Sequence, residues 1–140
     1  MPLESVTAAI LAQIAAEGGP ELNEMAIAES RAMYRKMQPE LPEIVVHSVE
    51  NLMIDGPAGA IPVRIYRPSA APAPVHLHFH GGGWVIGDLD THDRDCREIC
   101  LGAECIVVAV DYRLAPDHIF PAAPEDCYAA LCWATANEDL

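Results

Sequence analysis

The chain has few basic residues and no lysine-rich segment. Its 140 residues contain 8 Lys and Arg against 21 Asp and Glu, for a formal net charge of −13 at pH 7, and Lys36 is the only lysine. Nucleic-acid surfaces and polybasic membrane patches need clusters of Lys and Arg to neutralise phosphate, so the composition excludes both. A hydrophobic share of 51% is enough for a packed core, which excludes disorder and favours a small acidic globular domain.

The sequence also lacks the patterns that mark a secreted, membrane-spanning or zinc-binding protein. Its five cysteines are odd in number and no Cys-x-x-Cys pair occurs, so neither a disulfide framework nor a zinc knuckle is predicted. The N-terminus has no positive segment followed by an apolar stretch, as a secretory signal would. No apolar run approaches the ~20 residues that a spanning helix needs. We therefore expect a cytoplasmic protein without a membrane span.

The N-terminal 40 residues predict two helices. Apolar residues recur at helical spacing over residues 3–17, and a Gly-Gly-Pro stretch ends that pattern. A second helix is predicted over residues 23–37, with Asn23 as its N-cap. Its apolar stripe would consist of Met25, Ala28, Ala32 and Met33.

Beyond these helices, the pattern predicts a mixed α/β protein. The predicted strands are residues 45–54, 61–66, 75–79 and 105–110, and further helices are predicted to begin near residues 90 and 124. An Asp-Gly-Pro-Ala-Gly stretch between the first two strands indicates a hairpin. The run at 105–110 is apolar without alternation, as in a parallel strand covered on both faces. The order strand, helix, strand, helix with right-handed crossovers builds part of a doubly wound, mostly parallel sheet.

The most informative segment for chemistry is His80-Gly81-Gly82-Gly83-Trp84, directly after the strand at 75–79, which we expect to be buried. Three successive glycines remove every Cβ from a turn, so the backbone can take positive φ values and approach a ligand closely. Their N–H groups can then point into one cavity, which is how an oxyanion hole is built. A bare run of three glycines is more often a structural loop, so its surroundings decide the interpretation.

Three segments surround and include this loop in a familiar order. They are residues 80–84, Asp-Tyr-Arg-Leu-Ala-Pro at 111–116, and Phe-Pro-Ala-Ala followed by Glu-Asp within 120–126. Together they resemble the hormone-sensitive-lipase-like family of α/β-hydrolases, which contains bacterial carboxylesterases and lipases with a His-Gly-Gly-Gly motif. The resemblance covers essentially the whole chain.

The resemblance implies an α/β-hydrolase fold. Residues 1–40 would form a helical cap segment that contributes to a lid over the active site. Residues 41–140 would form the N-terminal half of the hydrolase domain, truncated before the nucleophile elbow. Arg113 and Asp126 would be structural.

The resemblance also assigns site residues. The backbone N–H groups of Gly82 and Gly83 would stabilise the oxyanion, Gly81 would shape the turn, and His80 would hold the loop. Trp84 would pack beside the acyl or alcohol pocket. The implied reaction is serine-dependent hydrolysis of short- to medium-chain acyl esters, with no cofactor and no metal.

The nucleophile of such an enzyme is missing from the sequence. A serine esterase needs Gly-x-Ser-x-Gly after the oxyanion loop, and then an acid and a histidine. The four serines precede the loop and lack glycines two residues to either side: Ser5, Ser30, Ser48 and Ser69. We therefore predict a truncated hydrolase that supplies most of an oxyanion hole and is inactive alone. The alternative is a non-catalytic interaction module, or one half of a split or oligomer-completed hydrolase.

Two further clusters and one edge bear on ligands and partners. The clusters are the alternating histidines His76, His78 and His80, and the acids Asp88, Asp90, Asp93 and Asp95. No carboxylate completes a known metal-ligand spacing around the histidines, and the acids lack the glycine and distal glutamate of a calcium loop, so no metal is expected.

Half of a doubly wound sheet leaves an edge unpaired, so we expect self-association or a partner chain there. A small-molecule ester would bind only if the missing half completes the site.

Overall fold

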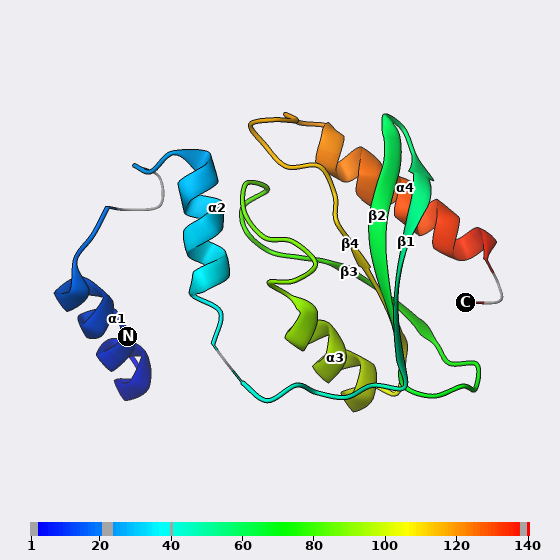
Figure 1. The fold of residues 1–140 in the computed structure, drawn as a ribbon, viewed down its shortest axis with the longest axis horizontal. Helices are drawn as coiled ribbons and strands as arrows, with labels where there is room; N and C mark the ends of the chain where they lie inside the picture. Colours follow the sequence, from blue (N-terminus) through cyan, green and yellow to red (C-terminus); the bar gives the residue numbers. More distant parts are fainter. Residues whose placement is uncertain (1–2, 21–23, 40, 138–139) are drawn as a thin grey trace.

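The computed structural model describes residues 3–20, 24–39, 41–137 and 140. Within these ranges eight elements follow in chain order: α1 (Ser5–Glu17), α2 (Ile27–Lys36), β1 (Ser48–Gly56), β2 (Gly59–Arg67), β3 (Val75–Phe79), α3 (Asp93–Gly102), β4 (Ile106–Val110) and α4 (Ala122–Ala136). The described strands form one sheet in the order β1-β2-β4-β3, with α3 on one face and α4 on the other (Figure 1). The predicted α/β architecture is confirmed.

Strand β4 lies at the centre of the sheet and is buried along its whole length. It pairs antiparallel with β2 and parallel with β3, so the predicted parallel pair is confirmed and the hairpin adds antiparallel strands beside it. Its side chains alternate between two cores. Ile106, Val108 and Val110 pack toward α4, whereas Val107 and Ala109 pack toward the α3 face. An unalternating apolar run is required because both faces of β4 are covered.

Strand β3 departs from expectation because it is not buried. It forms the edge of the described sheet, and Val75 and Phe79 at its two ends are exposed. Its partner along the described part of the chain is β4 alone. The expectation of a buried strand before the glycine loop is therefore wrong for this structure.

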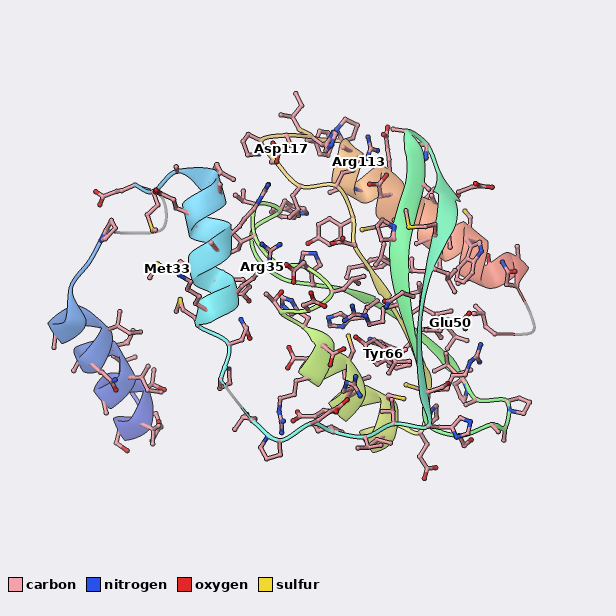
Figure 2. All side chains as sticks on the ribbon, viewed as in Figure 1. Met33, Arg35, Glu50, Tyr66, Arg113 and Asp117 are labelled. Carbon is pink, nitrogen blue, oxygen red and sulfur yellow. The ribbon has the colours of Figure 1, made fainter. Side chains whose placement is uncertain are left out.

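The two N-terminal helices form as predicted, but their apolar stripes are not buried. On α1, Ile10 and Ile14 are exposed. On α2, the buried residue is Ser30, while Met33 of the predicted stripe is exposed. Figure 2 shows Met33 on the side of α2 away from the sheet and Arg35 on the side toward it. The predicted stripe is wrong, since α2 meets the rest of the protein through polar side chains.

Asn23, the predicted N-cap of the second helix, lies outside the described residues, and α2 begins after Ala26 without a side-chain cap. Among the described residues, no helix is both long and apolar enough to cross a membrane.

A buried carboxylate joins α4 to the chain that leaves β4. Asp126 is 1% exposed and accepts hydrogen bonds from the Arg113 backbone N–H at 3.0 Å and from the Arg113 guanidinium at 2.8 Å. Charge-assisted bidentate contacts of this kind are directional, so they fix the start of α4 against the sheet. The structural role predicted for these two residues is confirmed.

Asp126→Asn should lower the free energy of unfolding, measured by urea denaturation, by well over the roughly 0.5 kcal/mol typical of surface substitutions. The substitution removes a charge that Arg113 pairs with and leaves a buried amide poorly satisfied. Glu125→Gln is the matched control, because Glu125 is exposed and its carboxylate lies 3.9 Å from the same guanidinium. Equal losses for the two variants would contradict the assignment.

Candidate functional site

The glycine loop after β3 adopts a conformation that requires glycine at specific positions. Gly82 and Gly83 have φ values of 125° and 61°. A Cβ at Gly82 would collide with the carbonyl oxygen of Ile86. That close approach exists because the N–H groups of Val85 and Ile86 both donate to the Gly82 carbonyl, at 3.1 and 3.0 Å. Gly81 differs, since its φ is not positive and a Cβ there would meet nothing within 4 Å.

The N–H groups of Gly82 and Gly83 donate to no acceptor among the described residues. Both glycines line a depression of about 360 Å³, together with Phe79, Tyr112 and Cys127. Burial raises the pKa of Cys127 to about 11. The Cys127 thiol therefore stays protonated at neutral pH, which makes it a poor nucleophile. Two free donors beside a depression form an arrangement that can stabilise a negatively charged oxygen.

Tyr112 and His80 hold the start of the loop. The Tyr112 hydroxyl donates to the His80 carbonyl at 2.6 Å, and the two rings stack with centroids 4.4 Å apart. His80 Nδ1 lies 2.7 Å from the Gly81 carbonyl oxygen, so the tautomer with a proton on Nδ1 makes a hydrogen bond there. Gly87 closes the loop over this ring, because its φ is 97° and a Cβ would strike His80 Nδ1.

Trp84 ends the loop and faces an apolar cavity. Its side chain is 66% exposed, and its φ of 61° is unusual for a residue with a Cβ. The cavity, about 580 Å³, is lined by Gly83, Trp84, Ala115, His118, Phe120, Ala123 and Pro124. The Trp84 carbonyl accepts a hydrogen bond from Ala115 N–H at 2.8 Å, which ties the glycine loop to the chain after β4.

The chain is similar in sequence and in structure to proteins described as esterases. A family model described as alpha/beta hydrolase fold matches residues 76–139. Esterase LipI and carboxylic ester hydrolase LipN of Mycobacterium tuberculosis are 54% and 52% identical over 110 residues, which is 74% and 77% of this chain. The matches cover 34% of LipI and 29% of LipN, so the chain spans about a third of the length of these curated relatives.

This chain belongs to the hormone-sensitive-lipase-like family of α/β-hydrolases. Solved structures agree with the sequence matches. An esterase of Pyrobaculum calidifontis has a TM-score of 0.86 at 38% identity, covering 99% of this chain and 45% of that one. A thermostable esterase of Pseudomonas putida has a TM-score of 0.88 at 31% identity, covering 95% of this chain and 43% of that one. The α/β-hydrolase fold expected from the motifs is confirmed.

The alternating histidines form a packed cluster beneath the family's glycine loop. His92, at the start of α3, stacks on His80 with centroids 5.2 Å apart and contacts His78 at 6.1 Å. The ring centroids of His76 and His78 lie 6.1 Å apart, and those of Tyr34 in α2 and His92 lie 6.3 Å apart. Among the described residues, no group of three His, Cys, Asp or Glu side chains has a geometry that could hold a metal ion.

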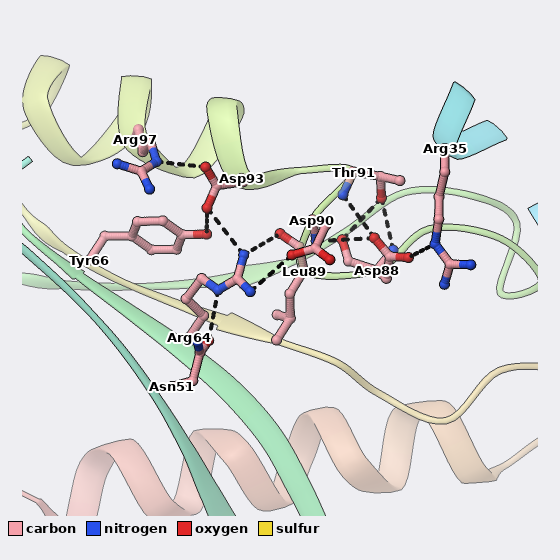
Figure 3. A network of polar contacts seen from close by, with 10 residues as sticks. All are labelled: Arg35, Asn51, Arg64, Tyr66, Asp88, Leu89, Asp90, Thr91, Asp93 and Arg97. Carbon is pink, nitrogen blue, oxygen red and sulfur yellow. Dashed lines mark hydrogen bonds and ion pairs between the residues drawn. The ribbon is translucent and has the colours of Figure 1, made fainter. Parts of the chain in front are cut away.

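The acidic cluster is an ion-pair network (Figure 3). Asp93 accepts hydrogen bonds from the Tyr66 hydroxyl at 2.8 Å and from Arg97 at 2.6 Å, and Arg64 pairs with Asp90 at 2.9 Å. Asp88 accepts from the Thr91 N–H and from Arg35. Burial opposes ionisation of Asp88, but these hydrogen bonds outweigh it and lower its pKa. Asp88 and Asp93 therefore anchor α2 and α3 beside the loop, whereas Asp95 of the same cluster is exposed.

The sequence interpretation missed two residues around the loop. Gly87 lies next to His80, and Arg31 of α2 donates to the carbonyl groups of Val85 and Ala115. Gly87 had a usable signal, since an isolated glycine a few residues after a turn indicates a positive φ or a close approach. Arg31 had none, because its partners are backbone carbonyls 54 and 84 residues away in the chain.

Acidification through the histidine range should destabilise the fold. Burial lowers the pKa of His78 and of His80 below the ordinary value of 6.5, and the Nε2 atoms of both are buried without a hydrogen-bond partner. The unfolded chain therefore binds protons more readily, so this stability is complete above about pH 6.5 and is lost as the pH falls toward the folded pKa values. Thermal unfolding from about pH 8 to pH 5 measures the loss.

His78→Phe should flatten this pH dependence, because it keeps an aromatic ring in the cluster and removes the titrating group. His47→Asn is the control, since His47 is exposed on the approach to β1. A pH profile that His78→Phe leaves unchanged would contradict the role of the buried histidine.

Proposed function

We propose that this chain contributes the oxyanion-hole loop to a site that hydrolyses carboxylic esters. The observation that carries the proposal is the pair of N–H groups, on Gly82 and Gly83, that have no acceptor among the described residues and border a depression and an apolar cavity. The relatives reported above include proteins described as esterases and carboxylic ester hydrolases. The substrate class we propose is a small acyl ester, and the chemistry calls for no cofactor.

The proposed chemistry follows from where charge develops. When a nucleophile attacks an ester carbonyl, the carbonyl oxygen gains negative charge in the tetrahedral intermediate. Donors that are already in position stabilise that oxygen without reorganisation, and losing one typically costs about 3 kcal/mol of transition-state stabilisation. In our proposal Gly82 and Gly83 supply two such donors. Trp84 and the cavity beside it hold an apolar portion of the ester.

The nucleophile, acid and base of such a site would come from residues other than these 140. None of the four serines lines the depression beside the glycine loop. Ser5 bonds to Glu4, Ser30 bonds to the Ala26 carbonyl, and Ser69 accepts from the Ala71 N–H. Large apolar side chains next to the loop are also exposed, with Trp84 at 66% and Phe120 at 84%, as expected for a surface that more polypeptide covers.

We extend the proposal to the N-terminal segment and to the compartment. Residues 1–40 act as a cap segment, since α2 bonds through Arg31 to Val85, next to the glycine loop, and to Ala115, which lines the apolar cavity. Residues 41–140 then form part of the hydrolase domain. All five cysteines are free thiols, including the exposed Cys132, which supports a reducing cytoplasm.

A second candidate function is interaction without catalysis. Strand β3 forms the edge of the described sheet with Val75 and Phe79 exposed, and such edges pair readily with other strands. Sedimentation of the purified chain tests this: concentration-dependent association favours a partner at the edge, and a stable monomer at all concentrations counts against it.

Titration with n-butyrate should shift the amide signals of Gly82 and Gly83 in nitrogen–proton correlation spectra, because the carboxylate stands in for the oxyanion. n-Butyramide, which is neutral, should shift them far less. Gly82→Ala should abolish the response, since its Cβ would displace the Ile86 carbonyl. Gly81→Ala is the matched control and should keep it, because a Cβ there meets open space. Equal responses to the acid and the amide would refute the assignment.

The purified chain should hydrolyse p-nitrophenyl butyrate no faster than a control protein of similar composition. Replacing all four serines by alanine should leave that background rate unchanged, because none lies beside the loop. Turnover that disappears on replacing a serine would show that this chain carries its own nucleophile.

A further inference from the structure

We infer that Arg31 of α2 is a positioning residue that sets the orientation of the Gly83 N–H in the glycine loop. Its consequence for anion binding rests on the proposed function, whereas its effect on the geometry of the loop does not. Arg31 lies far from the loop in sequence and outside every motif that identifies the family.

The guanidinium of Arg31 joins three groups on two separate segments. Its Nε donates to the Val85 carbonyl at 2.8 Å, Nη2 donates to the Ala115 carbonyl at 3.0 Å, and Nη1 pairs with the Asp117 carboxylate at 2.8 Å. The Arg31 side chain is only 25% exposed, whereas Asp117 is 60% exposed. A planar fork of donors suits several acceptors at once, and a lysine ammonium cannot reproduce that geometry.

The contact with Val85 reaches the glycine loop through rigid peptide units. The Val85 carbonyl and the Ile86 N–H belong to one planar peptide. That Ile86 N–H donates to the Gly82 carbonyl at 3.0 Å. The Gly82 carbonyl in turn shares a peptide with the Gly83 N–H. Arg31 therefore restrains, through two peptide planes and one hydrogen bond, the direction in which the Gly83 N–H points.

The contact with Ala115 reaches the same peptide by a second and less direct route, because the Ala115 carbonyl and the Ala115 N–H lie on different peptide units that meet at the Ala115 Cα. The Ala115 N–H donates to the Trp84 carbonyl at 2.8 Å, and the Trp84 carbonyl shares a peptide with the Val85 N–H. The Val85 N–H also donates to the Gly82 carbonyl, at 3.1 Å. Both routes thus converge on the single peptide between Gly82 and Gly83.

The hydrogen bonds from Val85 and Ile86 to the Gly82 carbonyl hold the loop only if the peptides that carry these N–H groups are themselves held. Gly82 and Gly83 have positive φ values, and glycine explores that region and others at little cost. The exposed ion pair with Asp117 contributes little by itself, since solvent screens such pairs. The carbonyl contacts of Arg31 therefore carry the positioning, and the same contacts attach α2 to the segments that contain Val85 and Ala115.

The chain supplies two matched controls. Arg35 lies one turn further along α2 and pairs with Asp88 at 2.6 Å, so Arg35→Ala removes an arginine from the same helix without touching either route to Gly82. Asp117→Asn removes the ion pair of Arg31 and leaves both carbonyl contacts in place.

Amide hydrogen exchange in the 140-residue chain tests the inference. Arg31→Ala should speed exchange of the Val85 and Ile86 N–H groups about tenfold, as expected for the loss of charge-assisted hydrogen bonds. Exchange of Val108 in β4 should not change, which shows that the core stays folded. Arg35→Ala and Asp117→Asn should leave the exchange rates of the Val85 and Ile86 N–H groups within about twofold of those in the unaltered chain. A change of that size is smaller than the loss of one hydrogen bond would cause.

Chemical rescue of the Arg31→Ala variant and its binding of n-butyrate distinguish positioning of the loop by Arg31 from a general effect of Arg31 on stability. Ethylguanidinium added to Arg31→Ala should restore slow exchange of Ile86 and should do nothing to Asp117→Asn. Arg31→Lys should restore it only in part, because one ammonium cannot serve both carbonyls. n-Butyrate should bind Arg31→Ala several-fold more weakly than it binds the two control variants.

Unchanged exchange of Val85 and Ile86 in Arg31→Ala would overturn the inference, as would equal effects of Arg35→Ala. If the unaltered chain does not bind n-butyrate at all, the proposed function fails, and the exchange measurements still decide whether Arg31 positions the loop.

Discussion

Everything near the candidate site depends on the parallel pairing of β3 with β4. Because β4 is hydrogen-bonded on both edges and covered on both faces, it is the most constrained segment of the described chain. Parallel pairing places the carboxyl ends of both strands at one edge of the sheet, so the glycine loop after β3 lies beside the segment that starts at Asp111. The contacts of Tyr112 with His80, and of Ala115 with Trp84, then follow from chain geometry. A loop of glycines would otherwise have no reason to hold one conformation.

The features that the sequence predicted are those with a local physical cause. The apolar run of β4, the turn residues of the β1–β2 hairpin and the positive φ at Gly82 and Gly83 each follow from a few neighbouring residues. The features that escaped prediction come from contacts between distant segments. The exposure of β3 depends on which strands lie beside it. The role of Arg31 depends on backbone carbonyl groups, which every residue type has and which a sequence pattern therefore does not reveal.

Helix α2 shows why an apolar stripe can mislead. Helical spacing of Met33 with small apolar neighbours predicts a buried face only if the helix packs against an apolar surface. This helix lies against two loops whose accessible groups are backbone carbonyls and carboxylates. Arginine satisfies such groups, so the inward face carries Arg31 and Arg35. Each arginine gives up part of its hydration for contacts that also require its partner loops to be in place, which makes attachment of the helix sensitive to the conformation of those loops.

Contacts from distant segments also explain how a loop rich in glycine, a residue with great backbone freedom, holds a single conformation. Glycine provides the backbone conformation and the close approach to Ile86, but it provides no side chain to hold the result. The holding groups come from elsewhere: Tyr112 after β4, the His80 ring with His92 of α3 stacked on it, and Arg31 of α2. Each of these contacts is made to a backbone carbonyl oxygen or to the ring of His80. None of them uses the N–H groups of Gly82 and Gly83, which therefore stay free. The free donors are therefore a consequence of restraint through carbonyl groups, since a loop held through its N–H groups would have none left to offer a ligand.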